Sequence, residues 1–191
     1  MSNPMTEITQ RPMRADARRN YAKLVAAARQ SFTETGNETA LETVAERAGV
    51  GIGTLYRHFP TRQALLEAVY ADEVDAMARA ADELSDRDPW DALSEWFHQY
   101  VGFAATKRAL MDALLEAAPD SDVLVRCRTA LARAGAELIS RAQAAGVVRD
   151  DVEFLDVGRM VSQIAVAPNA DAEQKQKMLQ LVLDGLRYRG A

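Results

Sequence analysis

Two short helix-forming segments separated by a pair of glycines occupy residues 39–60. Apolar residues recur at helical spacing from Leu41 to Ala48, and Gly49-Val50-Gly51 then interrupts the pattern. Glycine ends helices because it readily adopts the left-handed backbone at a C-terminus. Helical spacing resumes at Ile52, and Pro60 ends it because the residue before a proline is pushed out of helical conformations. The pattern predicts a helix-turn-helix whose second helix is too short to be stable alone.

The rest of the chain also predicts helices and no strands. The 191 residues include 35 alanines, and alanine is the strongest helix former and a poor strand residue. Apolar residues recur at steps of three and four through most of the sequence. We therefore expect an all-α chain of about nine helices, with separate helices over 90–106 and 110–118. Domains are expected at 1–13 (a flexible basic arm), 14–62 (three helices, with the motif at about 40–59) and 63–191.

Local signals predict where several of these helices begin and end. Thr39 and Glu42 have the spacing of a capping box, in which each side chain satisfies a backbone N–H of the other. Asp88-Pro89 combines a capping residue with proline at the first helical position. Asp171 is the expected cap of the last helix, and Gly146 ends the long helix before residue 147.

Charge is distributed unevenly along the chain. Residues 1–65 carry nine Lys/Arg against six Asp/Glu, whereas residues 66–191 carry 14 against 22. A basic end on an acidic body suggests a partner that is a polyanion. The single cysteine, Cys127, excludes an intrachain disulfide, and no apolar run is long enough to span a membrane. We expect a cytoplasmic protein without a metal site, a cofactor or a catalytic motif.

Three stretches of sequence resemble a known family. Residues 39–66, TALETVAERAGVGIGTLYRHFPTRQALL, resemble the DNA-binding domain of the TetR family of bacterial transcriptional regulators. WFHQYVGFAATKRALMDALL, from Trp96, resembles the C-terminal domain of an actinobacterial-type branch, and LVLDGLR is typical of the last helix of the family. The resemblance implies a C-terminal domain that senses a ligand and dimerises.

The resemblance also assigns residues to double-stranded DNA. Arg62 matches the residue that binds a phosphate, and Gly51 replaces a serine or a lysine-rich turn that is more usual in the family. Arg57 is the side chain on the second helix of the motif that can make a bidentate contact to guanine. The expected DNA-binding residues are Thr43, Gly51, Ile52, Gly53, Thr54, Tyr56, Arg57, His58 and Arg62.

Two further sets of residues are expected in the C-terminal domain. Residues 90–106 are rich in aromatics in an aromatic-poor chain, which suggests either core or an apolar ligand pocket. The expected pocket consists of Trp96, Phe97, Tyr100, Phe103, Met111, Leu115, Met160, Gln163 and Ile164. Small residues beside apolar stripes suggest a dimer interface on the last two helices, formed by Val157, Gly158, Val161, Leu181, Val182, Gly185 and Leu186.

The function expected from these features is ligand-responsive regulation of transcription. A homodimer would bind a palindromic DNA operator as a repressor, and a small apolar effector molecule would release it. Two alternatives remain from the residues alone: a helical enzyme, or a helical dimerisation module without sequence-specific DNA binding.

Overall fold

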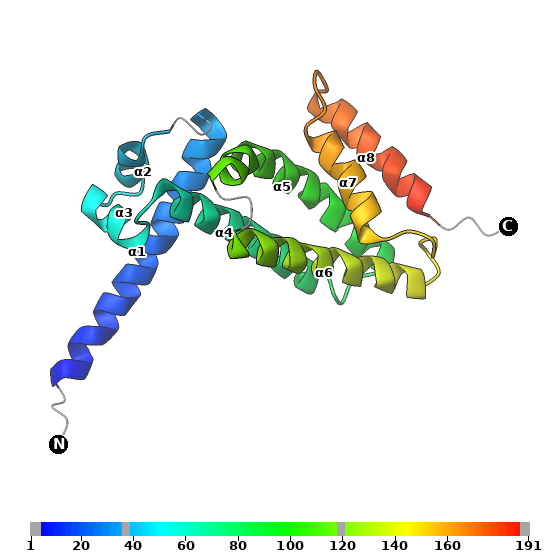
Figure 1. Cartoon of the computed structure of the whole chain (residues 1–191). Helices are drawn as coiled ribbons and strands as arrows, with labels where there is room; N and C mark the ends of the chain where they lie inside the picture. Colours follow the sequence, from blue (N-terminus) through cyan, green and yellow to red (C-terminus); the bar gives the residue numbers. More distant parts are fainter. Residues whose placement is uncertain (1–4, 36–38, 118–120, 188–191) are drawn as a thin grey trace. The chain divides into compact units, whose positions relative to one another are not determined.

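A computed structural model shows an all-helical chain (Figure 1). It describes residues 5–35, 39–117 and 121–187, with the backbone alone for 5–14, 105–109, 111–113 and 115–117. The described residues form eight helices: α1 (Met5–Thr35), α2 (Leu41–Arg47), α3 (Ile52–His58), α4 (Arg62–Glu83), α5 (Pro89–Ala117), α6 (Asp122–Ala144), α7 (Phe154–Ala165) and α8 (Ala172–Leu186).

The chain divides into two compact units, Met1–Val69 and Tyr70–Ala191. In the first unit, α1 packs against α2 and α3, and α2 packs against α3. The core of this unit contains Leu24, Leu55 and Leu65, which are fully buried. Because the first two turns of α4 bury side chains here, the unit ends at Val69, beyond the residue 62 expected from the sequence.

The second unit is built around α5, which packs against α6, α7 and α8. Helix α7 also packs against α6 and α8. The indole N–H of Trp96 donates to the carbonyl of Met77 at 2.9 Å and so ties α5 to α4. Within the described residues, no helix is both long and apolar enough to cross a membrane.

Several helix ends lie where the sequence predicted them. The Asp88 carboxylate accepts from the amides of Trp90 and Asp91 at the start of α5. The Asp171 carboxylate accepts from the Gln174 amide at 2.8 Å and caps α8. Gly146 follows α6 with a φ of 70°. These contacts satisfy backbone groups that a helix end leaves without partners.

The structure corrects three local predictions. Residues 90–106 and 110–118 were expected as two helices, but α5 runs unbroken to Ala117, because residues 107–109 contain polar side chains and no glycine or proline. The N-cap of α2 is Ala40 rather than Thr39, whose hydroxyl donates to the Ser31 carbonyl at 3.1 Å. Helix α1 begins at Met5, where a flexible arm was expected, since residues 5–11 are compatible with a helix.

Candidate functional site

The turn between α2 and α3 depends on Gly49. This residue has a φ of 67°, a backbone conformation that costs little only for glycine. Its amide donates to the Glu46 carbonyl, and the Val50 amide donates to the Ala45 carbonyl, both at 3.0 Å. Gly51 then serves as the N-cap of α3 with an extended backbone, φ −70° and ψ 147°. The turn therefore fixes the direction in which α3 leaves α2.

Helix α3 has one buried face and one exposed face. Leu55 is fully buried, and Phe59, directly after the helix, is 3% exposed. On the other face, Ile52 is 37% exposed and Tyr56 is 46% exposed. Since exposing large apolar and aromatic side chains gains nothing for the fold, this face is a candidate contact surface.

The structure brings the expected DNA-binding residues together around α2, α3 and the start of α4. Thr54 and His58 are half-buried, as is Arg62. A Cβ added to Gly51 or to Gly53 would meet no atom within 4 Å. The packing of the chain therefore does not require a glycine at either position, and both leave the surface clear for a partner. The exposed members of the set are Thr43, Gly51, Ile52, Gly53, Tyr56 and Arg57.

Two residues of this set contact other parts of the first unit. The Arg62 guanidinium donates from Nη1 to the Thr39 carbonyl at 2.6 Å, and its Cζ lies 5.2 Å from the centre of the Phe32 ring. The His58 ring meets the ring of Tyr21 edge-on, with centroids 6.1 Å apart. Tyr21 lies on α1, and its side chain is 43% exposed beside α3. Tyr21 therefore extends the candidate surface.

The aromatic residues expected to line a pocket form a packed cluster instead. Trp96 and Phe97 are fully buried, and the Trp96 ring stacks on that of Tyr100 with centroids 5.3 Å apart. Phe154 closes this cluster from α7, with its ring 5.7 Å from that of Trp96. Phe103 continues it, 5.6 Å from Tyr100. The cluster is part of the hydrophobic core, because the rings pack directly against one another in edge-on and stacked contacts.

The other residues of the expected pocket do not line a single cavity together with this cluster. Ile164 is buried, whereas Met160 and Gln163 are exposed. The side chains of Met111 and Leu115 lie outside the described residues. Of the expected set, only Tyr100 and Gln163 are among the described residues that line a pocket of about 310 Å³ formed by α5, α6 and α7.

The residues expected at a dimer interface also separate into two groups. Val157, Gly158, Val161 and Leu186 are buried within the unit. A Cβ on Gly158 would lie 3.1 Å from Cζ of Phe154, so this glycine accommodates an internal ring. Leu181, Val182 and Gly185 instead reach the surface, where Leu181 is 65% exposed. The sequence pattern marked an apolar stripe but not which side of each helix faced the core.

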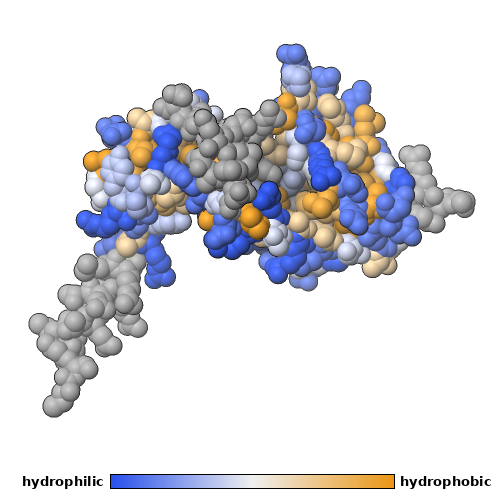
Figure 2. Space-filling model, in the orientation of Figure 1, coloured by the Kyte–Doolittle hydropathy of each residue, from blue (hydrophilic) through white to orange (hydrophobic). Residues whose placement is uncertain are grey.

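An apolar groove of about 400 Å³ runs between α7 and α8. Met160 and Leu181 line it, and both side chains are more than half exposed. Figure 2 shows apolar residues on the surface over these two helices. Because exposed apolar patches of this kind mark contact surfaces, the groove is a candidate interface.

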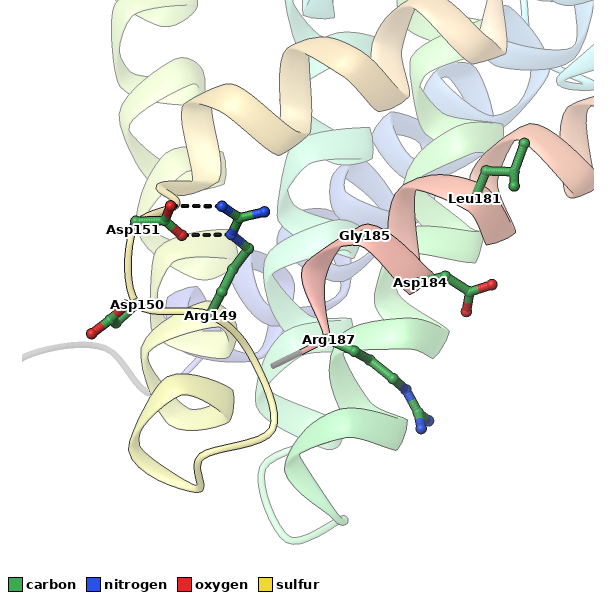
Figure 3. A pocket seen from close by; sticks show the side chains of 7 residues that line it. All are labelled: Arg149, Asp150, Asp151, Leu181, Asp184, Gly185 and Arg187. Carbon is green, nitrogen blue, oxygen red and sulfur yellow. Dashed lines mark hydrogen bonds and ion pairs between the residues drawn. The ribbon is translucent and has the colours of Figure 1, made fainter. Parts of the chain in front are cut away.

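A hollow of about 720 Å³ borders this groove and has a charged lining (Figure 3). Arg149 donates from Nε and Nη2 to both carboxylate oxygens of Asp151, at 2.5 and 2.7 Å. This hydrogen bonding lowers the pKa of Asp151. Figure 3 shows the side chains of Asp184 and Arg187 pointing away from that pair. In this hollow and in the rest of the described residues, His, Cys, Asp and Glu form no group of three that could hold a metal ion.

Comparison with known proteins identifies the family of the chain. Residues 24–69 match the tetR family of bacterial regulatory proteins, and residues 88–188 match the C-terminal domain of SbtR-like transcriptional regulators. A TetR transcriptional regulator from Streptomyces coelicolor has 36% identity and a TM-score of 0.78, over 89% of this chain and 99% of that one. A TetR transcription regulatory protein from Mycobacterium vanbaalenii has 34% identity and a TM-score of 0.75, over 93% and 100%.

Curated relatives are matched over a shorter length. An HTH-type transcriptional regulator from Staphylococcus aureus is 32% identical over 88 residues, which cover 44% of this chain. The chain spans about half the length of the curated relatives it matches. The family matches and the two full-length structural relatives agree with the helix-turn-helix built by α2 and α3. The chain therefore belongs to the TetR family of bacterial regulatory proteins.

Proposed function

We propose that the chain regulates transcription by binding double-stranded DNA through the exposed face of α3. One observation carries the proposal: α3 buries Leu55 in the core of the first unit and leaves Ile52, Tyr56 and Arg57 exposed at the surface. Open space above Gly51 and Gly53 lets a nucleic-acid backbone or groove approach closely. Within the described residues, Arg57 has no ion-pair partner, so its guanidinium is available to a base edge or a phosphate.

The short recognition helix favours a dimer. Seven residues of α3 rise only about 10 Å, which is enough to read a few base pairs. Two copies related by a two-fold axis read a palindrome and gain both affinity and specificity. The α7–α8 groove, with Leu181, Val182 and Gly185 at the surface, is the proposed contact between the copies.

Control by a small molecule completes the proposal. The pocket between α5, α6 and α7 lies in the second unit, whereas the proposed DNA-contacting helices α2 and α3 lie in the first. Helix α4 contributes residues to both units. A ligand changes DNA binding only if it binds the DNA-competent and the released states with different affinity. By linkage, operator DNA then weakens ligand binding by the same factor. Repression follows where the bound dimer occludes a promoter.

The test is selection of DNA by the purified chain from a random library, followed by footprinting. We expect a palindromic site with an affinity that falls steeply as salt rises. Tyr56→Phe removes only a hydroxyl from an exposed side chain, so it should leave stability unchanged. It should lower the affinity for DNA because that hydroxyl lies on the proposed DNA-contacting face. Arg126→Ala, a change at an exposed position on α6, is the control that leaves DNA binding unchanged. Failure to enrich any sequence would favour a helical dimerisation module, and turnover of a substrate would favour an enzyme.

A further inference from the structure

The pocket between α5, α6 and α7 differs in character from the apolar cavity expected for this unit. It measures about 310 Å³, which suits a small organic molecule. Leu131 and Phe154 form its floor and are almost fully buried, and Leu155 contributes an exposed apolar wall. Apolar surface of this kind accepts the hydrocarbon part of a ligand.

Helical spacing brings two arginines to this apolar floor. On α6, Arg128 lies three residues before Leu131, so both side chains lie on one side of the helix. On α7, Arg159 lies four residues after Leu155 and three before Ser162, again on one side. Two neighbouring helices thus each contribute one guanidinium to the same pocket.

The charge of this pocket is positive without compensation. Its described lining contains Arg128 and Arg159 and neither aspartate nor glutamate. Both arginines are exposed, and neither makes an ion pair within the described part of the chain. Residues 70–191, which form this unit, carry 21 Asp/Glu against 14 Lys/Arg, so two cations without a carboxylate run against the net charge of the unit. Guanidinium groups arranged in this way bind carboxylate or sulfonate groups.

A polar pair marks the inner end of the pocket. The Tyr100 hydroxyl lies 3.2 Å from the Ser162 hydroxyl, which itself donates to the Gly158 carbonyl at 2.7 Å. Tyr100 is therefore the donor in this pair. Burial raises the pKa of Tyr100, so its hydroxyl keeps the proton at neutral pH. Both hydroxyl protons are engaged in these contacts, so the acid group of a ligand depends on the two cations.

We propose that this pocket binds an organic anion, with its acid group between Arg128 and Arg159 and its apolar part on Leu131 and Phe154. The proposal rests on the regulator function proposed above and specifies the chemical class of its effector: an amphipathic acid rather than a purely apolar molecule. The anionic group should make an amphipathic acid bind more tightly than a neutral molecule of the same shape. Only the acid pairs with the two arginines.

Two fluorescent probes of nearly the same shape test the charge requirement directly. 1-Anilinonaphthalene-8-sulfonate carries one negative charge, and N-phenyl-1-naphthylamine has the same aromatic rings without it. Each is titrated into the full chain in the absence of DNA. We expect the sulfonate to bind at least about tenfold more tightly than the neutral probe, because a hydrogen bond to a charged group is worth about one factor of ten or more. Equal affinity, or no binding of the sulfonate, would overturn the proposal.

Three variants assign the site. Arg128→Gln and Arg159→Gln should each weaken the sulfonate about tenfold and leave the neutral probe unchanged. Arg126→Gln, on the same helix but outside the pocket lining, is the matched control and should bind both probes as the wild type does. Because these side chains are exposed, all three variants should fold, which circular dichroism verifies. An equal loss in the control variant would show that only general surface charge attracts the probe.

A parallel DNA-selection experiment separates this proposal from the regulator function. Charge-dependent probe binding with no selected DNA would retain the anion pocket and reject the regulator. Selected DNA with no charge preference between the probes would retain the regulator and reject the anion pocket.

Discussion

Arg62 is expected to contact DNA and also to stabilise the fold, and replacing it tests the second role through the free energy of unfolding. The family resemblance assigns this residue to a phosphate, so Arg62→Ala alone would be expected to weaken DNA binding. In the structure its guanidinium also holds the Thr39 carbonyl at 2.6 Å and covers the Phe32 ring at 5.2 Å. Arg62 therefore joins the start of α4 to the segment before α2 and to α1.

The cost of removing this side chain follows from those two contacts. Because Arg62 is half-buried, we take the lower end of each range: about 1.5 kcal/mol for a hydrogen bond to a charged group and about 0.5 kcal/mol for the cation–π contact. Arg62→Ala should therefore lower the free energy of unfolding by about 2 kcal/mol. A Thr39 carbonyl left without this donor faces water more often, so the α2 segment should also open more frequently.

Urea unfolding followed by circular dichroism measures the free energy, and hydrogen exchange of residues 39–47 shows where it is lost. Arg57→Ala is the matched control, since Arg57 is exposed on α3 and its loss should change stability by less than about 0.5 kcal/mol. Both variants should bind DNA more weakly in a gel shift. If Arg62→Ala unfolds at the same urea concentration as the wild type, the structural role assigned to Arg62 is wrong.

Four other substitutions test separate parts of the structure. Gly53→Ala should leave stability equal or higher by about 0.5 kcal/mol while weakening DNA binding in a gel shift, because its Cβ meets open space; unchanged binding would move the contact face. Gly135→Ala should lower the free energy of unfolding by about 1–3 kcal/mol in thermal melts, because its Cβ would lie 2.7 Å from Cγ of Phe154; a variant as stable as wild type would contradict this packing. Leu181→Arg should give monomers in sedimentation velocity without loss of stability, since Leu181 is exposed; a surviving dimer would place the interface elsewhere. Burial raises the pKa of Tyr70, so above about pH 10, where the tyrosine of the unfolded chain ionises first, the free energy of unfolding should fall by roughly 1.4 kcal/mol per pH unit. In urea titrations at pH 8–11, Tyr70→Phe should make this fall with pH less steep. An unchanged pH dependence in the variant would assign the fall to other groups.

The structure also redirects one test of the dimer. A double substitution of Leu181 and Leu186 by arginine follows naturally from their shared apolar stripe. Leu186, however, is buried within the unit, so a charge there would unfold the chain and produce monomers for the wrong reason. Leu181 alone presents a large apolar side chain to a second copy, which makes it the informative position.

Local interactions account for what the sequence predicted well. The turn at Gly49 needs only a residue that accepts a positive φ, and the caps at Asp88 and Asp171 need only a carboxylate next to free amides. The buried face of α3 follows from the spacing of Leu55 and Phe59. Each of these features depends on a few neighbouring residues, so the sequence is sufficient to predict them.

Packing between distant helices decided what the sequence left open. The aromatics of residues 90–106 predicted either a core or a pocket, and Phe154, more than fifty residues away, completes the core by filling the space beside Trp96 and Tyr100. The pocket lies next to this cluster, and Arg128 from α6 and Arg159 from α7 both line it. Helical periodicity identifies apolar stripes within one helix, but it cannot determine which stripe faces a neighbour and which faces water. That choice depends on the helices packed around it, and so only the tertiary structure assigned Val161 to the core and Leu181 to the surface.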